Sequence, residues 1–180
     1  MTEQNNKDYI EGLELVIPTE EHRAQVEKYK NDMLCAGSKL NGCSELEKDD
    51  FDTWLRKCRD WEIGKNLPEG YNPATQYICI RKTDNKIIGM FNLIHRDFGG
   101  HLGYSIAPDE RKKGYGTQML ALGLQKCKEK GYDKALCYVR DTNIGSKKCI
   151  LNNGGKLETK IYREDDDVIL EKYWICLGDK

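Results

Sequence analysis

The residues best suited to do chemistry form one short run in the middle of the chain, where three basic residues precede two glycines: Arg111-Lys112-Lys113-Gly114-Tyr115-Gly116. The run follows an expected strand and opens an expected helix. The first turn of a helix presents unpaired backbone N–H groups and a partial positive charge, and glycine lets an anion approach such groups closely. The run therefore predicts a site for a multiply phosphorylated ligand, to which the basic side chains add charge.

Two common phosphate-binding patterns do not fit this run. The Walker pattern G-x-x-x-x-G-K-[ST] is absent, and the dinucleotide pattern G-x-G-x-x-G fails because Met119 stands where its third glycine should be. The run matches [RQ]-x-x-G-x-[GA] instead. A glycine-opened helix with solvated lysines would give the same match, so the surrounding sequence has to support it.

A second segment makes the match more specific. Asn143 and Ser146 have the spacing Asn-x-x-Ser at the start of an expected short helix, 143–151, which a run of asparagine and glycine closes. Together with the strand before the loop, these residues resemble the GNAT acetyltransferase superfamily, whose members bind acetyl-CoA. The resemblance extends from about residue 13 to residue 177, and its specific part lies within 101–158.

The resemblance implies acetyl-CoA as the co-substrate and assigns parts of it to particular residues. The main chain of Ile106 and Ala107 would contact the pantetheine arm, and Asn143 and Ser146 would lie near the pantetheine or the adenosine. Asn143 also suits the N-cap of its helix, and the two roles are compatible. The pyrophosphate would bind at the loop and the first helical turn, formed by Arg111, Lys112, Lys113, Gly114, Tyr115, Gly116 and Thr117.

The chemistry that the resemblance implies is direct attack of an amine on the acetyl thioester. An alkylammonium with a pKa near ~10.4 must first lose a proton, so a general base is useful. His101 begins the strand that carries the site and is the candidate base, although a lone histidine at a strand end is also typical of a polar surface. A backbone N–H of the same strand can hold the oxyanion, and Ile106 is the expected donor.

The general acid departs from the family pattern. The family often places a tyrosine in the second half of the Asn-led helix, and Ile150 occupies that position here. Tyr104 is the candidate substitute, with Tyr138 and Tyr173 as open alternatives. A thiol with a pKa of about 8.5 leaves readily, so an acid is optional. The missing tyrosine keeps open a second hypothesis, a catalytically impaired CoA-binding sensor or partner module; transfer of an acyl group larger than acetyl is a third.

Hydrophobic periodicity predicts the elements that must position these residues. The expected order is β-α-α-β-β-β-α-β-α-β-β, an α/β (α+β) fold with a mixed central sheet of about seven strands and helices on both faces. The expected strands are 13–17, 76–82, 86–95, 101–107, 135–139, 156–162 and 168–177, and the expected helices begin near residues 18, 51, 114 and 143. We expect a single acetyltransferase domain over 1–180, with 1–12 as an N-terminal extension and 101–158 as the acetyl-CoA-binding core.

Beside the loop, Asp109 and Glu110 are expected to be solvated or to cap a helix.

Composition limits the remaining function classes. Of the 180 residues, 33% are charged and 38% are hydrophobic, and the mean hydropathy is −0.75, which is typical of a soluble globular protein. No apolar stretch is long enough to span a bilayer, and the first residues lack the apolar region of a signal peptide. We therefore expect a cytoplasmic protein with no membrane partner. A net charge of −1 argues against a general nucleic-acid binder.

The chain has eight cysteines, with no C-x-x-C pair and no histidine at metal-ligand spacing from them. Because several occupy apolar positions in periodic segments, we expect free, mostly buried thiols and no metal site. The expected partners are acetyl-CoA and an amine of a small molecule or a protein. A homodimer stays open as well, with the terminal hairpin around Tyr173, Trp174 and Ile175 as its candidate interface.

Overall fold

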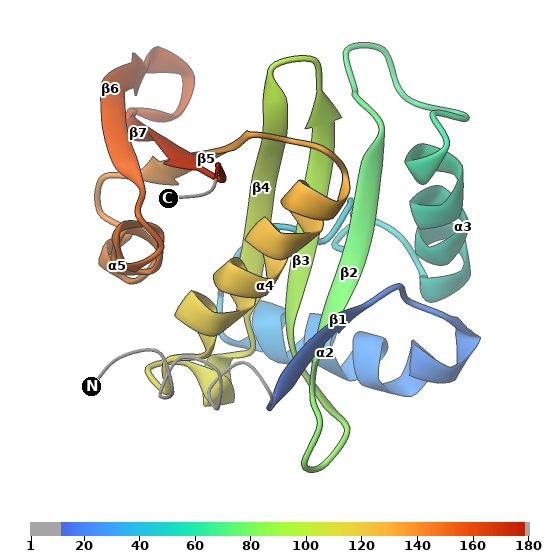
Figure 1. Cartoon of the computed structure of the whole chain (residues 1–180). Coiled ribbons are helices and arrows are strands. Elements are labelled where there is room, and N and C mark those ends of the chain that lie inside the picture. The colour runs from blue at the N-terminus through green and yellow to red at the C-terminus, as the bar shows by residue number, and fades with distance from the viewer. Residues whose placement is uncertain (1–11, 179–180) are drawn as a thin grey trace.

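The computed structural model describes residues 12–178, so nearly all of the expected N-terminal extension lies outside the described residues. Within that range, seven strands form one sheet, as expected, and helices flank it (Figure 1). The strands are β1 (Leu13–Val16), β2 (Ala74–Arg81), β3 (Lys86–Arg96), β4 (Gly99–Ile106), β5 (Lys134–Arg140), β6 (Lys156–Arg163) and β7 (Val168–Cys176). The helices are α2 (Arg23–Cys35), α3 (Phe51–Glu62), α4 (Tyr115–Glu129) and α5 (Ile144–Asn152), with 3-10 turns at Glu20–His22, Pro108–Glu110 and Glu164–Asp166.

The sheet is mixed, as the sequence predicts, with the strand order β1-β2-β3-β4-β5-β7-β6. Neighbouring strands are antiparallel except for β4 and β5, which are parallel. A parallel pair needs a crossover connection, and α4 provides it. The order therefore places the loop that opens α4 at the end of a central strand.

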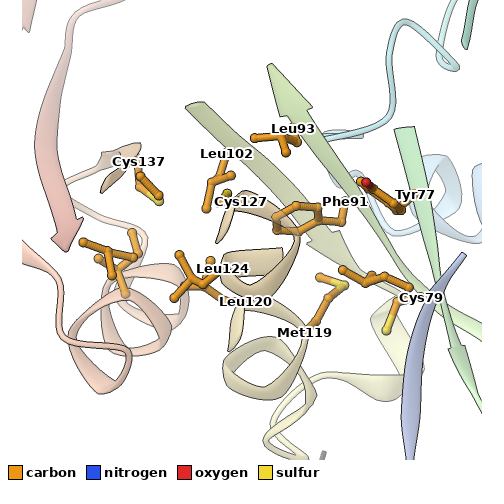
Figure 2. Packing of buried hydrophobic residues seen from close by; sticks show 14 of the residues in the cluster. Tyr77, Cys79, Phe91, Leu93, Leu102, Met119, Leu120, Leu124, Cys127 and Cys137 are labelled. Carbon is orange, nitrogen blue, oxygen red and sulfur yellow. The ribbon is translucent and has the colours of Figure 1, made fainter. Parts of the chain in front are cut away.

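Helices cover both faces of the sheet, and each face has its own apolar core. One cluster lies between the sheet and α4, where Phe91, Met119 and Leu120 are fully buried (Figure 2). The other lies between the sheet and the pair α2 and α3, and it includes Trp54, which is fully buried. Because side chains alternate along a strand, β4 presents different groups to these two faces.

The close approach of α4 to the sheet depends on Gly123. A Cβ built at this position would lie 2.0 Å from Cζ of Phe91 on β3. The optimum for two carbon atoms is about 3.5–4.0 Å, so no side chain fits there. The glycine thus lets α4 pack directly on Phe91, and this contact fixes the position of the helix relative to β4.

Most element boundaries lie within one or two residues of their expected places. The largest difference is at the first helix, expected to begin near residue 18: a 3-10 turn occupies Glu20–His22, and α2 begins at Arg23. At β4, the strand begins at Gly99 instead of residue 101, because both glycines ahead of His101 already pair with β3. The connection between β3 and β4 is therefore reduced to residues 97–98.

All eight cysteines lie among the described residues and are free thiols. Five are buried, which confirms the expectation of mostly buried thiols: Cys43, Cys58, Cys79, Cys127 and Cys137. From residue 12 to residue 178, no helix is both long and apolar enough to cross a membrane.

Candidate active site

The strands β4 and β5 part near the centre of the sheet. Their parallel pairing covers two residue pairs, Gly100 with Ala135 and His101 with Leu136. Beyond these pairs, within the described part of the chain, β4 pairs with β3 alone and β5 with β7 alone. Residues 102–106 therefore have one edge without a partner strand, and this edge leads directly into the loop that opens α4 (Figure 1). Unpaired backbone groups at such an edge are available to an extended ligand.

Tyr104 and Ile106 direct their backbone groups to this unpaired edge. The N–H of Ala107 donates to the carbonyl of Ile88 on β3 at 2.8 Å. Successive residues of a strand alternate between its two edges, so Ile106 and Tyr104 point their N–H groups away from β3. The carbonyl of Ile106 accepts a hydrogen bond from Nε of Arg111 at 3.1 Å. The N–H of Ala107, contrary to our expectation, is not available to a pantetheine arm, because β3 already uses it.

The length of β4 separates two of the residues expected to act in catalysis. His101 and Ile106 are five positions apart in the strand, about 16 Å at a rise of ~3.3 Å per residue. A base and an oxyanion donor that serve one acetyl group must lie closer together than that. We therefore move the candidate oxyanion donor from Ile106 to the N–H of Tyr104, which is on the same edge and nearer to His101.

The loop after β4 presents unbonded N–H groups at the start of α4. Its course is set by two residues of positive φ, Lys112 at 61° and Gly114 at 85°. In the described structure, neither a backbone carbonyl nor a capping side chain accepts a hydrogen bond from the N–H groups of residues 112–117. A cluster of such donors at a helix N-terminus suits a phosphate group, and it stands where the sequence predicts the pyrophosphate.

Gly116, the second glycine of the motif, serves helix packing. A Cβ at Gly116 would lie 2.9 Å from Sγ of Cys149 on α5. Its missing side chain therefore faces α5, so this glycine is needed for the contact between the two helices. The close approach of an anion to the loop depends on the backbone N–H groups instead.

The three basic side chains of the loop differ in their availability to a ligand. Arg111 donates to Oγ of Ser38 at 2.9 Å, in addition to its bond with the β4 main chain. Lys113 pairs with Glu110 at 2.9 Å. The side chain of Lys112 is exposed and forms no ion pair or hydrogen bond with any described residue. Contrary to expectation, Arg111 and Lys113 donate hydrogen bonds within the protein, and Lys112 is the residue of the three whose side chain has no described protein partner.

Glu110 is not solvated, which corrects the sequence-based expectation. Its side chain is 3% exposed and pairs with Arg81, Lys86 and Lys113. Burial by itself would raise the pKa of Glu110, but the hydrogen bonds from these three cations outweigh burial and lower the pKa to about 2. Asp109, next to it, is exposed and pairs with Lys86, so the expectation is right for Asp109.

The helix α5 places Ser146 beside Tyr104. Oδ1 of Asn143 accepts a hydrogen bond from the N–H of Ser146 at 3.1 Å, which confirms the predicted N-cap. Oγ of Ser146 lies 2.9 Å from the Tyr104 hydroxyl. Burial raises the pKa of Tyr104 above its ordinary value, so the phenol is protonated at neutral pH and can donate. Ile150 is fully buried, so its position faces the core.

The other two tyrosines considered as acids have different surroundings. Tyr173 donates its hydroxyl to the buried carboxylate of Glu171 at 2.7 Å, so it supports the core beneath α5. Tyr138 is exposed and packs edge-on against the ring of His101, with centroids 5.4 Å apart. Of the three, Tyr104 is the tyrosine that lies between β4 and the Asn-led helix.

His101 lies on the opposite face of the sheet from Tyr104. Tyr104 packs against the α4 core, whereas the next residue, Ser105, accepts a hydrogen bond from Tyr29 of α2 at 3.0 Å, and His101 shares the face of Ser105 by alternation. Within residues 12–178, Nδ1 of His101 is buried and has no hydrogen-bond partner. Burial, and next the charge of Arg96, lower the pKa of His101 to about 4. The ring is therefore neutral at pH 7 and keeps a lone pair that can accept a proton.

These features combine into one arrangement. An unpaired strand edge ends at a phosphate-type helix N-terminus, with a neutral imidazole on one face and a protonated phenol on the other. Such a site can bind an acyl-CoA along the edge and transfer its acyl group to a nucleophile. The fold and the site thus define a CoA-dependent acyltransferase.

The model of the acetyltransferase (GNAT) family matches residues 40–154, which is more than half of the chain. The chain belongs to the GNAT acetyltransferase family. It is therefore an acetyltransferase.

Solved structures share the fold of this chain. An acetyltransferase from Salmonella typhimurium that modifies the N-terminal serine of ribosomal protein L7/L12 is 16% identical, with 93% of this chain and 96% of that one covered and a TM-score of 0.72. A ribosomal-protein-S5-alanine acetyltransferase from Vibrio fischeri is 15% identical, with 93% and 94% covered and a TM-score of 0.71. A spermidine N-acetyltransferase from Vibrio cholerae, in complex with CoA and spermine, is 15% identical, with 93% and 96% covered and a TM-score of 0.69. No curated protein matches the chain.

Proposed function

We propose that the enzyme acetylates a primary amine by direct attack in a ternary complex, with acetyl-CoA bound along the unpaired edge of β4. The observation that carries the proposal is the continuity between this edge and the unbonded N–H groups of residues 112–117. The pantetheine arm would take the place of the missing partner strand and bond to the N–H group of Ile106, which leaves the N–H of Tyr104 to the acetyl oxygen. The pyrophosphate would then reach the start of α4, where Lys112 adds a free positive charge.

Proton acceptance and proton donation would take place on opposite faces of the sheet. The amine would approach from the face of α2 and α3, and neutral His101 would accept its proton, directly or through water. As the new C–N bond forms, the N–H of Tyr104 would stabilise the oxyanion. As the C–S bond breaks, the Tyr104 hydroxyl, held by Ser146, would donate a proton to the leaving thiolate on the other face.

The surroundings of His101 favour an acceptor amine of low pKa. A base with a pKa of about 4 is weak, and the nearby charge of Arg96 further disfavours an ammonium. At neutral pH, a chain N-terminus with a pKa near ~7.8 is uncharged several hundred times more often than a lysine amine with a pKa near ~10.4. We therefore propose the α-amine of a peptide as the preferred acceptor, ahead of a lysine side chain or a polyamine.

Calorimetric titration with acetyl-CoA tests the donor site. We expect saturable binding by the wild-type protein and a loss of roughly tenfold or more in affinity for Lys112→Glu, because a negative charge would then face the pyrophosphate. Lys128→Glu is the matched control, since it makes the same charge change on an exposed residue near the other end of α4; its affinity should stay within about twofold, because added ions screen charges beyond ~10 Å. Absence of binding by the wild type would overturn the proposed donor site.

A comparison of acceptors tests the reaction and its selectivity. We would measure release of the CoA thiol with a peptide that has a free N-terminus and no lysine, with the same peptide N-terminally blocked but containing a lysine, and with spermidine. The free N-terminus should give the highest kcat/KM. A preference for spermidine would contradict the acceptor class, and donor binding without turnover of any amine would favour the sensor hypothesis.

A further inference from the structure

The buried carboxylate of Glu110 lies outside the reaction derived above, yet it is the most heavily paired group beside the loop. Its Oε1 lies 2.6 Å from Nζ of Lys86. Its Oε2 lies 2.8 Å from the Arg81 guanidinium and 2.9 Å from Nζ of Lys113. An ionised carboxylate that is only 3% exposed is tolerated because three cations surround it.

These ion pairs connect the loop to a part of the sheet that lies 24–29 residues earlier in the sequence. Arg81 is the last residue of β2 and Lys86 is the first of β3, so both belong to one hairpin. Arg81 also pairs with Asp84 in the turn of that hairpin at 2.6 Å. The hairpin therefore holds the Arg81 guanidinium in place on one side, and Glu110 binds it on the other.

The ion-pair cluster around Glu110 contacts both chain neighbours of Gly114, the glycine of positive φ in the loop. Lys113 precedes Gly114 and pairs with Glu110, whereas Tyr115 follows Gly114 and accepts a hydrogen bond on its hydroxyl from Arg81 at 3.2 Å. Gly114 itself has a φ of 85°, in a region that glycine enters freely. The residues before and after Gly114 are therefore both held by one cluster, which is centred on Glu110 and Arg81.

We propose that Glu110 is a positioning residue for the donor: it holds the loop in the conformation that aims the N–H groups of residues 112–117 at the pyrophosphate. The inference rests on the proposed donor site. It also assigns Lys113 to the protein's own ion-pair cluster instead of to the phosphates. In the proposed arrangement Glu110 lies on the phosphate side and would contact neither the acetyl group nor the amine, so its effect should be confined to donors that carry the pyrophosphate.

The test compares two donors in the variant Glu110→Gln. Acetyl-CoA carries the pyrophosphate, and S-acetyl-N-acetylcysteamine has the same thioester without any phosphate. For acetyl-CoA, KM should rise roughly tenfold or more because the phosphate donors are misplaced, with kcat at saturation within about twofold. For the truncated donor, kcat/KM should stay within about twofold of the wild-type value. A general loss of structure would lower activity with both donors.

The matched control is Asp109→Asn. Asp109 is the neighbouring acid and shares Lys86 with Glu110, but its side chain is 59% exposed and it contacts neither Arg81 nor Lys113. This variant should leave KM for both donors within about twofold, as expected for an exposed ion pair. The opposite view, in which Glu110 merely withholds Lys113 from the phosphates, predicts that Glu110→Gln lowers KM for acetyl-CoA. A lowered or unchanged KM would overturn the inference.

Two further measurements test the inference if Glu110→Gln does not fold or if no amine acceptor gives turnover. Tyr115→Phe removes only the hydroxyl bound by Arg81, and KM for acetyl-CoA should rise roughly threefold, the effect of one hydrogen bond; no change would contradict the inference. If no acceptor gives turnover, calorimetric titration with CoA compares the affinity of the wild type with that of Glu110→Gln. Equal CoA affinities of wild type and Glu110→Gln would overturn this inference alone, whereas a wild type that binds no CoA would overturn the proposed donor site as well.

Discussion

The Tyr104 hydroxyl lies 2.9 Å from Oγ of Ser146, and this contact joins β4 to α5 on the side where β4 has lost its partner strand. Tyr104 comes from the strand, and Ser146 comes from the first turn of the helix that Asn143 caps. The cap therefore fixes the helix turn that orients the phenol. Three residues that are separate in the sequence act here as one unit.

This contact predicts a catalytic effect for Tyr104→Phe. The variant keeps the ring and removes the proton that we assign to the leaving thiolate. Because a thiol leaves readily, kcat should fall by roughly 10²-fold, the low end for general acid catalysis, and KM for acetyl-CoA should change little. Steady-state kinetics at saturating acetyl-CoA measure this. Ser146→Ala, which leaves the phenol in place, should show a smaller loss; an unchanged kcat in Tyr104→Phe would remove the phenol from the mechanism.

The lowered pKa of His101 predicts how stability changes with pH. The folded-state pKa is about 4 and the ordinary value is 6.5, so the unfolded chain binds a proton first as the pH falls. The free energy of unfolding should therefore decrease from pH 6.5 towards pH 4. Urea denaturation at pH 7 and pH 5 measures the decrease. In His101→Gln the decrease should be smaller by about 1–2 kcal/mol; equal decreases in the two proteins would contradict the burial of a neutral imidazole.

The contact between Gly123 and Phe91 predicts a packing defect. In Gly123→Ala, the new methyl group would meet the Phe91 ring at 2.0 Å, so either α4 or the ring must move. We expect a loss of about 1–3 kcal/mol in the free energy of unfolding. In a Phe91→Leu background, the same substitution should cost less, since the clashing atoms are gone. A double-mutant cycle by urea denaturation checks this, and strict additivity would show that the two residues are not coupled.

The N-cap of α5 predicts a smaller, local effect. Asn143→Ala removes the acceptor of the Ser146 N–H bond, and the free energy of unfolding should fall by about 1 kcal/mol. Asn143→Asp keeps an acceptor oxygen at the same place and should recover most of the loss. If the two variants are equally destabilised, the cap bond is not what stabilises the helix.

Local sequence patterns predicted much of the fold and part of the site. Apolar spacing predicted the helix that begins at Phe51, and Asn143 was recognised as a cap, because both features depend on residues within one or two helical turns. The motif around Gly114 was found for the same reason, since its backbone conformation is a property of the loop itself. Glu110 carried no comparable signal, because two of its three cations come from a hairpin that lies 24–29 residues earlier.

By itself, then, the sequence determined the order of the elements, the phosphate-type loop, the capped helix and the family resemblance. The tertiary structure decided which groups are available: that β4 parts from β5 after His101, that Arg111 and Lys113 are bound within the protein, and that Tyr104 and His101 lie on opposite faces. The physical reason is the sequence separation of the residues that interact. Turn geometry and periodicity are set by near neighbours in the chain, whereas burial, strand pairing and ion pairs depend on residues that only folding brings together.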